Sequence, residues 1–381
     1  MHADNPIYLD YNSTTPVLPE VLEAMLPYLR GHCGNPSSSH VFGRRACAAV
    51  DNAREQVAAL LGCALDEIVF TSGGTEANNL ALRGATEAVA QRRQVVTSTI
   101  EHPSILAPCE WLERHGWRVS RVEVGHDGRV SLEQLIDSVG TGTALVTIMH
   151  SNNETGVLQP IAAIVRAAHE AGALVHTDAA QSVGKIRVDT RALGVDLMSI
   201  AGHKLYAPKG VGALYVRRGT AVKPFTLGAG HERGLRPGTE NVAGVVGLGA
   251  ACEVARLSLE AVGARMSALR DRLWRRLSRQ VPGLKLNGHV EERLPNTLNV
   301  CFPKVSGIAL LAATPEVAAS TGAACHDGHE APSAVLLAMG MPPEEAIGAV
   351  RLTLGRSTTD EEIGRAADAL SPAWIALSGL D

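Results

Sequence analysis

The feature that most constrains this chain is an alternation of short apolar segments with helical segments between residues 65 and 220. The helical segment 160–172, PIAAIVRAAHEAG, has proline at its start and glycine near its end, as helices commonly do. The apolar segments are near-continuous, as expected for strands covered on both faces. This order predicts an α/β fold with a mostly parallel central sheet and helices on both faces. The expected strands are residues 67–70, 94–99, 144–149, 173–179, 196–201 and 212–216.

The pattern changes after about residue 250 and indicates a second, smaller α+β domain. Residues 248–283 are expected to form a long helical stretch, with Gly263 as a candidate break and a Pro-Gly turn at its end. A short strand, TLNVCF, and a short helix, SAVLLAMG, follow. We therefore expect residues 15–260 to form a large domain, and residues 1–14 and 261–381 to form the small one.

Composition excludes several classes of protein. The net charge of −4 gives no basic surface for nucleic acid. No apolar run approaches the roughly 20 residues that span a bilayer, and the start of the chain does not resemble an export signal. Seven scattered cysteines without CxxC spacing favour neither a disulfide framework nor a zinc site. These observations predict a cytoplasmic protein that binds no membrane, nucleic acid or structural metal.

Polar residues collect where the expected strands end. Gly74 and Thr75 follow the first strand at the start of a helix, where free N–H groups can bind phosphate. His102 follows the second strand and can stack on a flat ligand or move a proton. Asn153 follows the third strand and can donate from its amide. The alternative for each position taken alone is an ordinary capped turn.

The next two strand ends supply an acid and an amine. Asp178 ends an apolar strand, where a carboxylate needs a cationic partner, and Gln181 lies three residues later. His203 and Lys204 follow the expected strand 196–201. Lysine can form a Schiff base with an aldehyde cofactor, and an aspartate can keep a pyridine nitrogen protonated. Together with the phosphate-binding helix start, these residues predict a site for pyridoxal 5′-phosphate.

In these residues and their order, the chain resembles the cysteine desulfurases, within the class V aminotransferase group of fold-type I pyridoxal-phosphate enzymes. The resemblance covers nearly the whole chain in order. Its motifs include YLDYNSTTP (8–16), FTSGGTEANNLAL (70–82), EHPSIL (101–106), MHSNNETGVLQPI (149–161), HTDAAQSVGKI (176–186), DLMSIAGHKLYAPKGVGALYVR (196–217), GHERGLRPGTENV (230–242), STGAAC (320–325) and AVRLTLGRSTTDEEI (349–363).

The resemblance implies a role for each candidate residue. It implies that the coenzyme is joined to Lys204, stacked under His102 and paired at its ring nitrogen with Asp178. It further implies that the enzyme is a homodimer that binds L-cysteine. The other implied contacts are Gln181 and Asn153 with the ring substituents, Gly74, Thr75 and His203 with the phosphate, Thr239 with the phosphate of the neighbouring subunit, and Arg351 with the substrate carboxylate.

Cys325 lies in STGAACHDGHEAPS, a stretch of small and polar residues typical of a loop that keeps a reactive thiol. The resemblance implies that Cys325 takes sulfur from cysteine as a persulfide and that alanine leaves. The sulfur would pass to an acceptor protein, such as an iron–sulfur scaffold or a tRNA-thiolation protein. The alternative for a single cysteine is a buried small hydrophobic residue.

Two departures from the family pattern keep other functions open. GAACH resembles selenocysteine lyases, so that activity on selenocysteine is an alternative, and Ala201 replaces a serine that commonly contributes a phosphate hydroxyl. A transaminase and a non-catalytic scaffold for sulfur-trafficking partners are further alternatives. The acidic and histidine residues after Cys325 are not expected to form a metal site, because so short a loop rarely orients ligands alone. They are His326, Asp327, His329 and Glu330.

Overall fold

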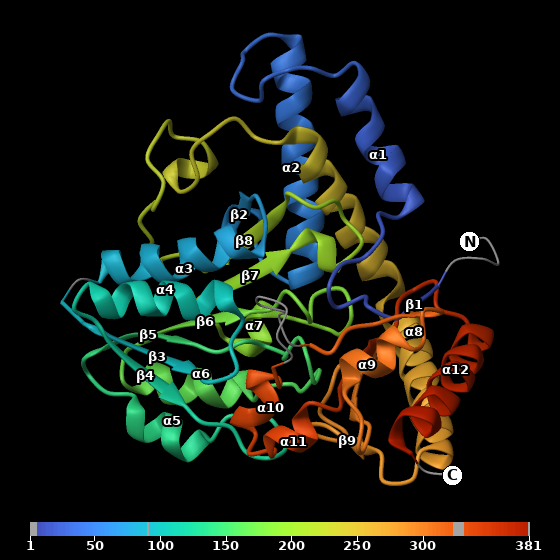
Figure 1. The fold of residues 1–381 in the computed structure, drawn as a ribbon. Helices are drawn as coiled ribbons and strands as arrows, with labels where there is room; N and C mark the ends of the chain where they lie inside the picture. Colours follow the sequence, from blue (N-terminus) through green and yellow to red (C-terminus); the bar gives the residue numbers. More distant parts are fainter. Residues whose placement is uncertain (1–5, 90, 323–330, 380–381) are drawn as a thin grey trace.

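The computed structural model describes residues 6–89, 91–322 and 331–379 and is built around one seven-stranded sheet (Figure 1). Strand β8 is antiparallel to both of its neighbours, and the other pairings are parallel. This arrangement confirms the predicted mostly parallel sheet. In sheet order the strands are β2 (Ile68–Thr71), β8 (Gly212–Val216), β7 (Leu197–Ala201), β6 (Leu174–Asp178), β5 (Thr143–Thr147), β3 (Gln94–Ser98) and β4 (Arg118–Val122).

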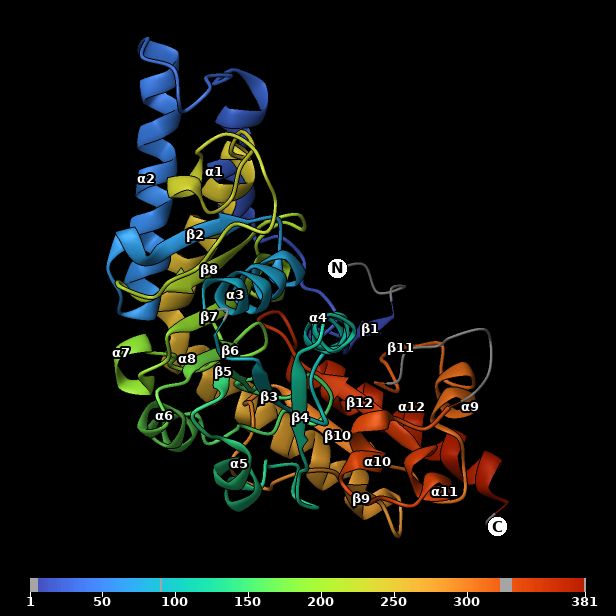
Figure 2. The ribbon, with the colours of Figure 1, turned by 90° about the vertical axis from the view of Figure 1, so that its left-hand side faces the viewer.

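Helices cover both faces of this sheet (Figure 2). Successive side chains of a strand point to opposite faces, so Val69 packs with α3 and α4, whereas Ile68 and Phe70 pack with α2 and α8. The first face is covered by α3 (Gly74–Ala88) and α4 (Pro103–Arg114). The second is covered by α2 (Val41–Leu61), α5 (Leu132–Ser138), α6 (Ile161–Glu170), α7 (Thr190–Leu193) and the first half of α8 (Val242–Gln280), with α1 (Pro19–Arg30) against α8.

The expected strands match the observed ones to within two residues at each end, but the sequence did not predict β4. This edge strand pairs only with β3 among the strands of its sheet. Two of its five residues, Arg118 and Arg121, are exposed arginines, so it lacks the continuous apolar run of a central strand.

A second, antiparallel sheet forms the smaller α+β part. It packs under the second half of α8 and under α12, around Leu273, Val300 and Trp374. Ile7 and Leu9 also pack in this core, which supports our proposal that residues 1–14 belong with residues 261–381. The elements are β12 (Ala349–Thr353), β10 (Thr297–Cys301), β9 (Lys285–Leu286), the pair β1 (Ile7–Tyr8) and β11 (Val317–Ala318), α9 (Gly307–Ala312), α10 (Ala334–Ala338), α11 (Pro343–Ala346) and α12 (Asp360–Ser378).

Helix α8 runs without a break for 39 residues, so the break considered at Gly263 is absent. Its first half packs on α1 and α2, and its second half packs on α12. One 18-residue window has a mean hydropathy of 1.5, enough by length and composition to cross a membrane. Half of that window is buried, and Val245, Leu248, Ala251 and Cys252 of this helix pack in the core beside the large sheet.

Candidate active site

A cavity of about 580 Å³ lies at the carboxyl edge of the large sheet, between this sheet and residues of β12 and α10. Ligands of open α/β sheets gather at this edge. Most of the candidate residues line it, although they come from five different strand ends and from β12. They are Gly74, Thr75, His102, Asn153, Asp178, Gln181, His203, Lys204 and Arg351.

Lys204 ends the 3₁₀ helix η2 (Gly202–Lys204), which follows β7. Its Nζ donates to the backbone oxygens of Asn12, at 2.5 Å, and Ser13, at 2.8 Å. Burial, and then the positive charge of Arg351, lower the pKa of this amine to about 8. A lysine with such a pKa is partly uncharged near neutral pH, and only the uncharged amine can attack an aldehyde.

Asp178 lies at the end of β6 and is held by amide donors. Its carboxylate accepts hydrogen bonds from Nδ2 of Asn78, at 2.8 Å, and from the backbone N–H of Ala180, at 2.9 Å. The amide oxygen of Asn78 is buried and has no hydrogen-bond partner among the described residues. A buried polar atom without a partner is uncommon, and this one leaves an acceptor beside the cavity that Asn78 lines.

His102 caps the start of α4 and is linked to Asp178 through two side chains. Its Nδ1 accepts from the backbone N–H of Ser104, and the Oγ of Ser104 lies 2.8 Å from both Nδ1 of His102 and Nδ2 of Asn78. Burial lowers the pKa of His102, so the neutral ring is favoured. With Nδ1 accepting, the proton of the neutral ring lies on Nε2.

The start of α3 forms the third part of the site. Gly73 precedes it with a φ of +153°, which side-chain-bearing residues rarely adopt. A Cβ on Gly212 of β8 would lie 2.7 Å from Cα of Gly73, so two glycines allow the turn to lie directly on the sheet. The first N–H groups of a helix have no partner within it and attract anions. Gly74 and Thr75 line the cavity at this point.

His203 contributes a neutral donor beside the same cavity. Its Nδ1 lies 3.2 Å from Oγ1 of Thr14. Burial, followed by the positive charge of Lys204, lowers the pKa of His203 to about 4. The imidazole is therefore uncharged near neutral pH and still has one N–H to donate.

These groups fit pyridoxal 5′-phosphate. The coenzyme needs an amine for its aldehyde, an acid for its ring nitrogen and a donor cluster for its phosphate. Lys204, Asp178 and the start of α3 meet these three needs within one cavity. The unpartnered oxygen of Asn78 and the lowered pKa of Lys204 are further signs of a site built around a bound group.

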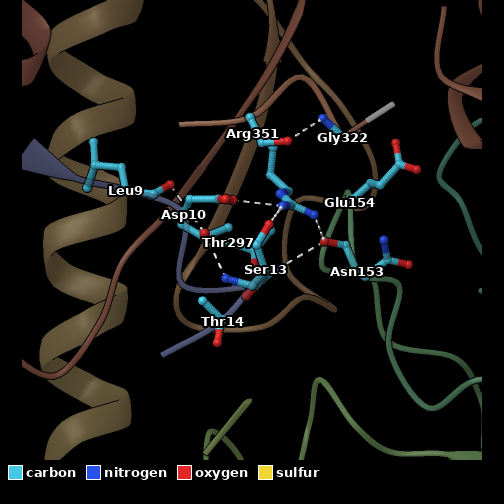
Figure 3. Close-up of polar contacts among 12 residues, drawn as sticks. Leu9, Asp10, Ser13, Thr14, Asn153, Glu154, Thr297, Gly322 and Arg351 are labelled. Atoms are coloured by element: carbon cyan, nitrogen blue, oxygen red, sulfur yellow. Dashed lines mark hydrogen bonds and ion pairs between the residues drawn. The ribbon is translucent and has the colours of Figure 1, made fainter. Parts of the chain in front are cut away.

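Arg351 lies on β12 and is held by the N-terminal segment (Figure 3). Its Nη2 lies 2.8 Å from Oδ1 of Asp10 and donates to Oγ of Ser13 at 2.6 Å. Its Nη1 donates to the backbone oxygen of Asn153 at 3.0 Å. Its Nε is buried and has no hydrogen-bond partner among the described residues, so the guanidinium keeps the Nε N–H and the second N–H of Nη1 as donors.

Sequence reasoning missed several residues of this site. Asp10 and Asn12 lie in the quoted motif YLDYNSTTP, but nothing in the local pattern shows that they reach residues 351 and 204. The sequence around Asn78 likewise predicts only a helix and does not show that this residue contacts Asp178. Glu154 was also missed: it accepts from Oγ of Ser333 at 2.5 Å, and burial raises its pKa to about 7.

The structure does not place two of the predicted site residues in this cavity. Thr239 is exposed in the segment before α8, the yellow segment that projects from the body in Figure 1, and it does not line the cavity of its own chain within the described ranges. Cys325 lies outside the described residues. The same is true of the neighbouring residues that were considered for a metal, His326, Asp327, His329 and Glu330.

The sequence is similar to those of a known protein family and of several cysteine desulfurases. The family described as "Aminotransferase class-V" matches residues 7–365. A cysteine desulfurase of Trichormus azollae is 47% identical over 361 residues, which cover 94% of this chain and 90% of that protein. The cysteine desulfurase IscS of Anaeromyxobacter dehalogenans is 49% identical over 362 residues, with the same coverage.

Solved structures show the same likeness. A NifS-like protein superposes with a TM-score of 0.91 at 37% identity, covering 98% of this chain and 100% of that chain. A structure of SspA in complex with cysteine superposes with a TM-score of 0.81 at 35% identity, covering 92% of this chain and 99% of that one.

Proposed function

Since the chain belongs to the class-V aminotransferases and, within them, to the cysteine desulfurases, we propose that it removes sulfur from L-cysteine in the cavity around Lys204 and leaves it on Cys325. The observation that carries this proposal is the meeting of Lys204, Asp178 and the start of α3 in one cavity. Pyridoxal 5′-phosphate, when bound, supplies an electron sink for the pair left at Cα of the amino acid.

Each residue then has a defined task. Lys204 Nζ removes the proton from Cα of cysteine, and its lowered pKa keeps an uncharged amine available for that step. The carboxylate of Asp178 holds the proton of the coenzyme's ring nitrogen. His102 packs over the ring, and its Nε2 is placed to hold or move a proton. Gly74, Thr75 and His203 bind the phosphate.

Arg351 and Asn153 orient the substrate. A guanidinium binds a carboxylate through two parallel hydrogen bonds, and Arg351 keeps a buried Nε without a described partner. The amide of Asn153 borders the same cavity. We propose that the carboxylate of cysteine binds between these two residues.

Sulfur transfer completes the reaction. The thiolate of Cys325 attacks the sulfur of cysteine, the new S–S bond forms as the Cβ–S bond breaks, and the electron pair of that bond stays with the carbon fragment. That fragment takes up one proton at Cβ, regains the Cα proton from Lys204, and leaves as alanine. The persulfide on Cys325 is then available to an acceptor protein, for which an iron–sulfur scaffold and a tRNA-thiolation protein are our two candidates.

We further propose that the protein is a cytoplasmic homodimer with shared sites. In this dimer, Thr239 of each copy reaches the phosphate site of the other. The exposed position of Thr239, away from the cavity of its own chain, supports this arrangement. Every cysteine within the described ranges is free of a disulfide, which is consistent with a reducing compartment.

The decisive experiment is product analysis with cysteine and with selenocysteine, with and without reductant. We expect alanine and sulfide from cysteine, and with Cys325→Ala we expect cysteine to change the visible spectrum without release of either product. Sulfide release by Cys325→Ala at the wild-type rate would remove Cys325 from the mechanism. Turnover of selenocysteine alone would assign the chain to the selenocysteine lyases. Transfer of the amino group to a 2-oxo acid would indicate a transaminase, and failure to bind the coenzyme would indicate a scaffold.

A further inference from the structure

Lys185 is a buried lysine that contacts two residues lining the active-site cavity, Asn12 and Gln181. It follows β6 by seven residues and is only 5% exposed. Its Nζ donates to Oε1 of Gln181, at 2.8 Å, and to Oδ1 of Asn12, at 3.1 Å. No carboxylate of the described part of the chain forms an ion pair with it, which is unusual for a buried lysine.

The number of hydrogen bonds matches an uncharged amine. A neutral amine has two N–H groups, and Lys185 faces two amide oxygens; an ammonium would have a third N–H to satisfy. Burial lowers the pKa of Lys185 well below its ordinary value, and the charges of Lys204 and Arg351 act in the same direction. Lys185 is therefore a donor rather than a fixed positive charge.

This donor determines which way the amide of Gln181 faces. Because Oε1 of Gln181 accepts from Lys185, Nε2 must lie on the other side, where it donates to the backbone oxygen of Asn12 at 2.9 Å. An amide nitrogen carries two hydrogens, so one N–H remains for the cavity that Gln181 lines. A flipped amide would place an acceptor there instead.

The second bond of Lys185 reaches the substrate side of the site through Asn12. Lys185 and Asn296 both donate to Oδ1 of Asn12, so Nδ2 of Asn12 faces the backbone oxygen of Asn153 at 3.2 Å. That same oxygen accepts from Arg351. The backbone oxygen of Asn12 also holds the amine of Lys204.

We propose that Lys185 is a positioning residue, whose amine fixes the amide of Gln181 so that an N–H faces the coenzyme ring. It does not touch the reacting atoms and acts through Gln181. The inference rests on the proposed function, because it takes Gln181 to contact the coenzyme.

The test compares Lys185→Met with the wild type in coenzyme affinity and visible spectrum. Methionine has a similar length and no donor, so we expect the Kd for pyridoxal 5′-phosphate to rise about ten-fold, the value of one buried hydrogen bond. We also expect the pH midpoint of the visible band to move, because the ring loses an oriented donor. An unchanged Kd together with an unchanged midpoint would overturn the proposal.

A double-mutant cycle separates positioning from simple structural support. In a Gln181→Ala background, Lys185→Met should cause no further loss of coenzyme affinity, because the residue through which it acts is gone. An equal loss in both backgrounds would contradict the proposal. If Gln181→Ala weakens binding whereas Lys185→Met does not, only the role of Lys185 fails. If Gln181→Ala binds as tightly as the wild type, the proposed coenzyme contact itself fails.

Two further variants keep the test informative if Lys185→Met does not fold. Circular dichroism shows whether each variant is folded. Lys185→Gln keeps an uncharged group with two N–H bonds. We expect its Kd for pyridoxal 5′-phosphate to stay within about three-fold of the wild type, because it should lose at most about half the free energy of a typical hydrogen bond. Lys185→Arg keeps a charge that cannot be lost, and we expect it to bind the coenzyme more weakly than Lys185→Gln. The reverse order would show that a charge is needed, and it would overturn the inference.

Discussion

Arg351 and Asp10 form an ion pair of 2.8 Å that joins β12 to the N-terminal segment at the edge of the cavity. The side chain of Arg351 is only 6% exposed, so this pair holds the guanidinium in place before any substrate arrives. The substrate carboxylate can therefore use the N–H groups left on Nε and Nη1 or share the guanidinium with Asp10. The planar fork of arginine is suited to such sharing, and a lysine is not.

Arg351→Lys should therefore weaken cysteine binding more than it slows the chemical steps. We expect KM to rise at least about ten-fold, which corresponds to the loss of one charge-assisted hydrogen bond, with a smaller change in kcat. Steady-state kinetics with cysteine measure both. Asp10→Asn is the matched control, and its KM should not rise, because the guanidinium loses a competitor. An unchanged KM in Arg351→Lys would show that the carboxylate binds elsewhere.

The lowered pKa of Lys204 should appear in the pH dependence of coenzyme uptake. The rate at which the apoprotein incorporates pyridoxal 5′-phosphate should rise with pH and level off above about 8, because only the uncharged amine attacks the aldehyde. Stopped-flow absorbance measures this rate. Replacing Arg351 by glutamine removes a positive charge that lowers this pKa, so the midpoint should move to higher pH. A midpoint near that of free lysine would contradict the assignment.

Ala201→Ser should strengthen coenzyme binding. Ala201 is buried at the end of β7, and its Cβ would lie 3.1 Å from a Cβ on Gly74, the first residue of α3. A hydroxyl there can donate to the phosphate, and a hydrogen bond to a charged group lowers Kd about ten-fold. Equilibrium titration of the apoprotein provides the measurement. Ala201→Val adds bulk without a donor and should bind more weakly than the wild type.

Glu154→Gln should change how stability depends on pH. Burial raises the pKa of Glu154 to about 7, whereas an unfolded glutamate has an ordinary pKa of 4.5. Its contribution to stability is therefore complete below pH 4.5 and is lost as the pH rises toward 7. Glutamine keeps the shape without the charge, so the variant should gain about 3 kcal/mol relative to the wild type between pH 4.5 and 8. Urea unfolding at several pH values measures this difference.

Ser333 offers a control of opposite sign. Its Oγ donates to Glu154, and this hydrogen bond lowers the pKa of the carboxyl. Ser333→Ala should therefore make the loss of stability with rising pH larger and extend it to higher pH. A parallel pH dependence for Glu154→Gln and the wild type would show that the carboxyl ionises without cost in the folded protein.

The large sheet could be predicted because its strands are buried on both faces. The bounds of β8 were predicted correctly, and those of β6 and β7 to within one residue at each end, because β7 and β8 are mostly apolar and β6 begins with an apolar run. β4 could not be predicted in this way, since an edge strand tolerates arginine. Gly263 suggested a break in α8, but packing against two cores outweighs the small helix preference of one glycine.

The candidate site could be predicted where chemistry is tied to a strand end. Lys204, Asp178 and His102 follow strands of one sheet, so their meeting follows from the topology. Asp10, Asn12 and Lys185 could not be placed in the same way. Their partners are set by how the N-terminal segment crosses from one sheet to the other, which no local pattern records.

Helix α8 is common to both parts of the molecule, because its first half packs on the large sheet and its second half lies in the core of the small one. At 1.5 Å per residue it is a continuous rod of about 58 Å. If α8 unfolds in one part, the other part loses a helix that covers one side of its hydrophobic core. The two parts of the molecule should therefore unfold in one cooperative transition. Cleavage of the chain in the middle of α8 would leave two fragments, each with one side of its hydrophobic core uncovered.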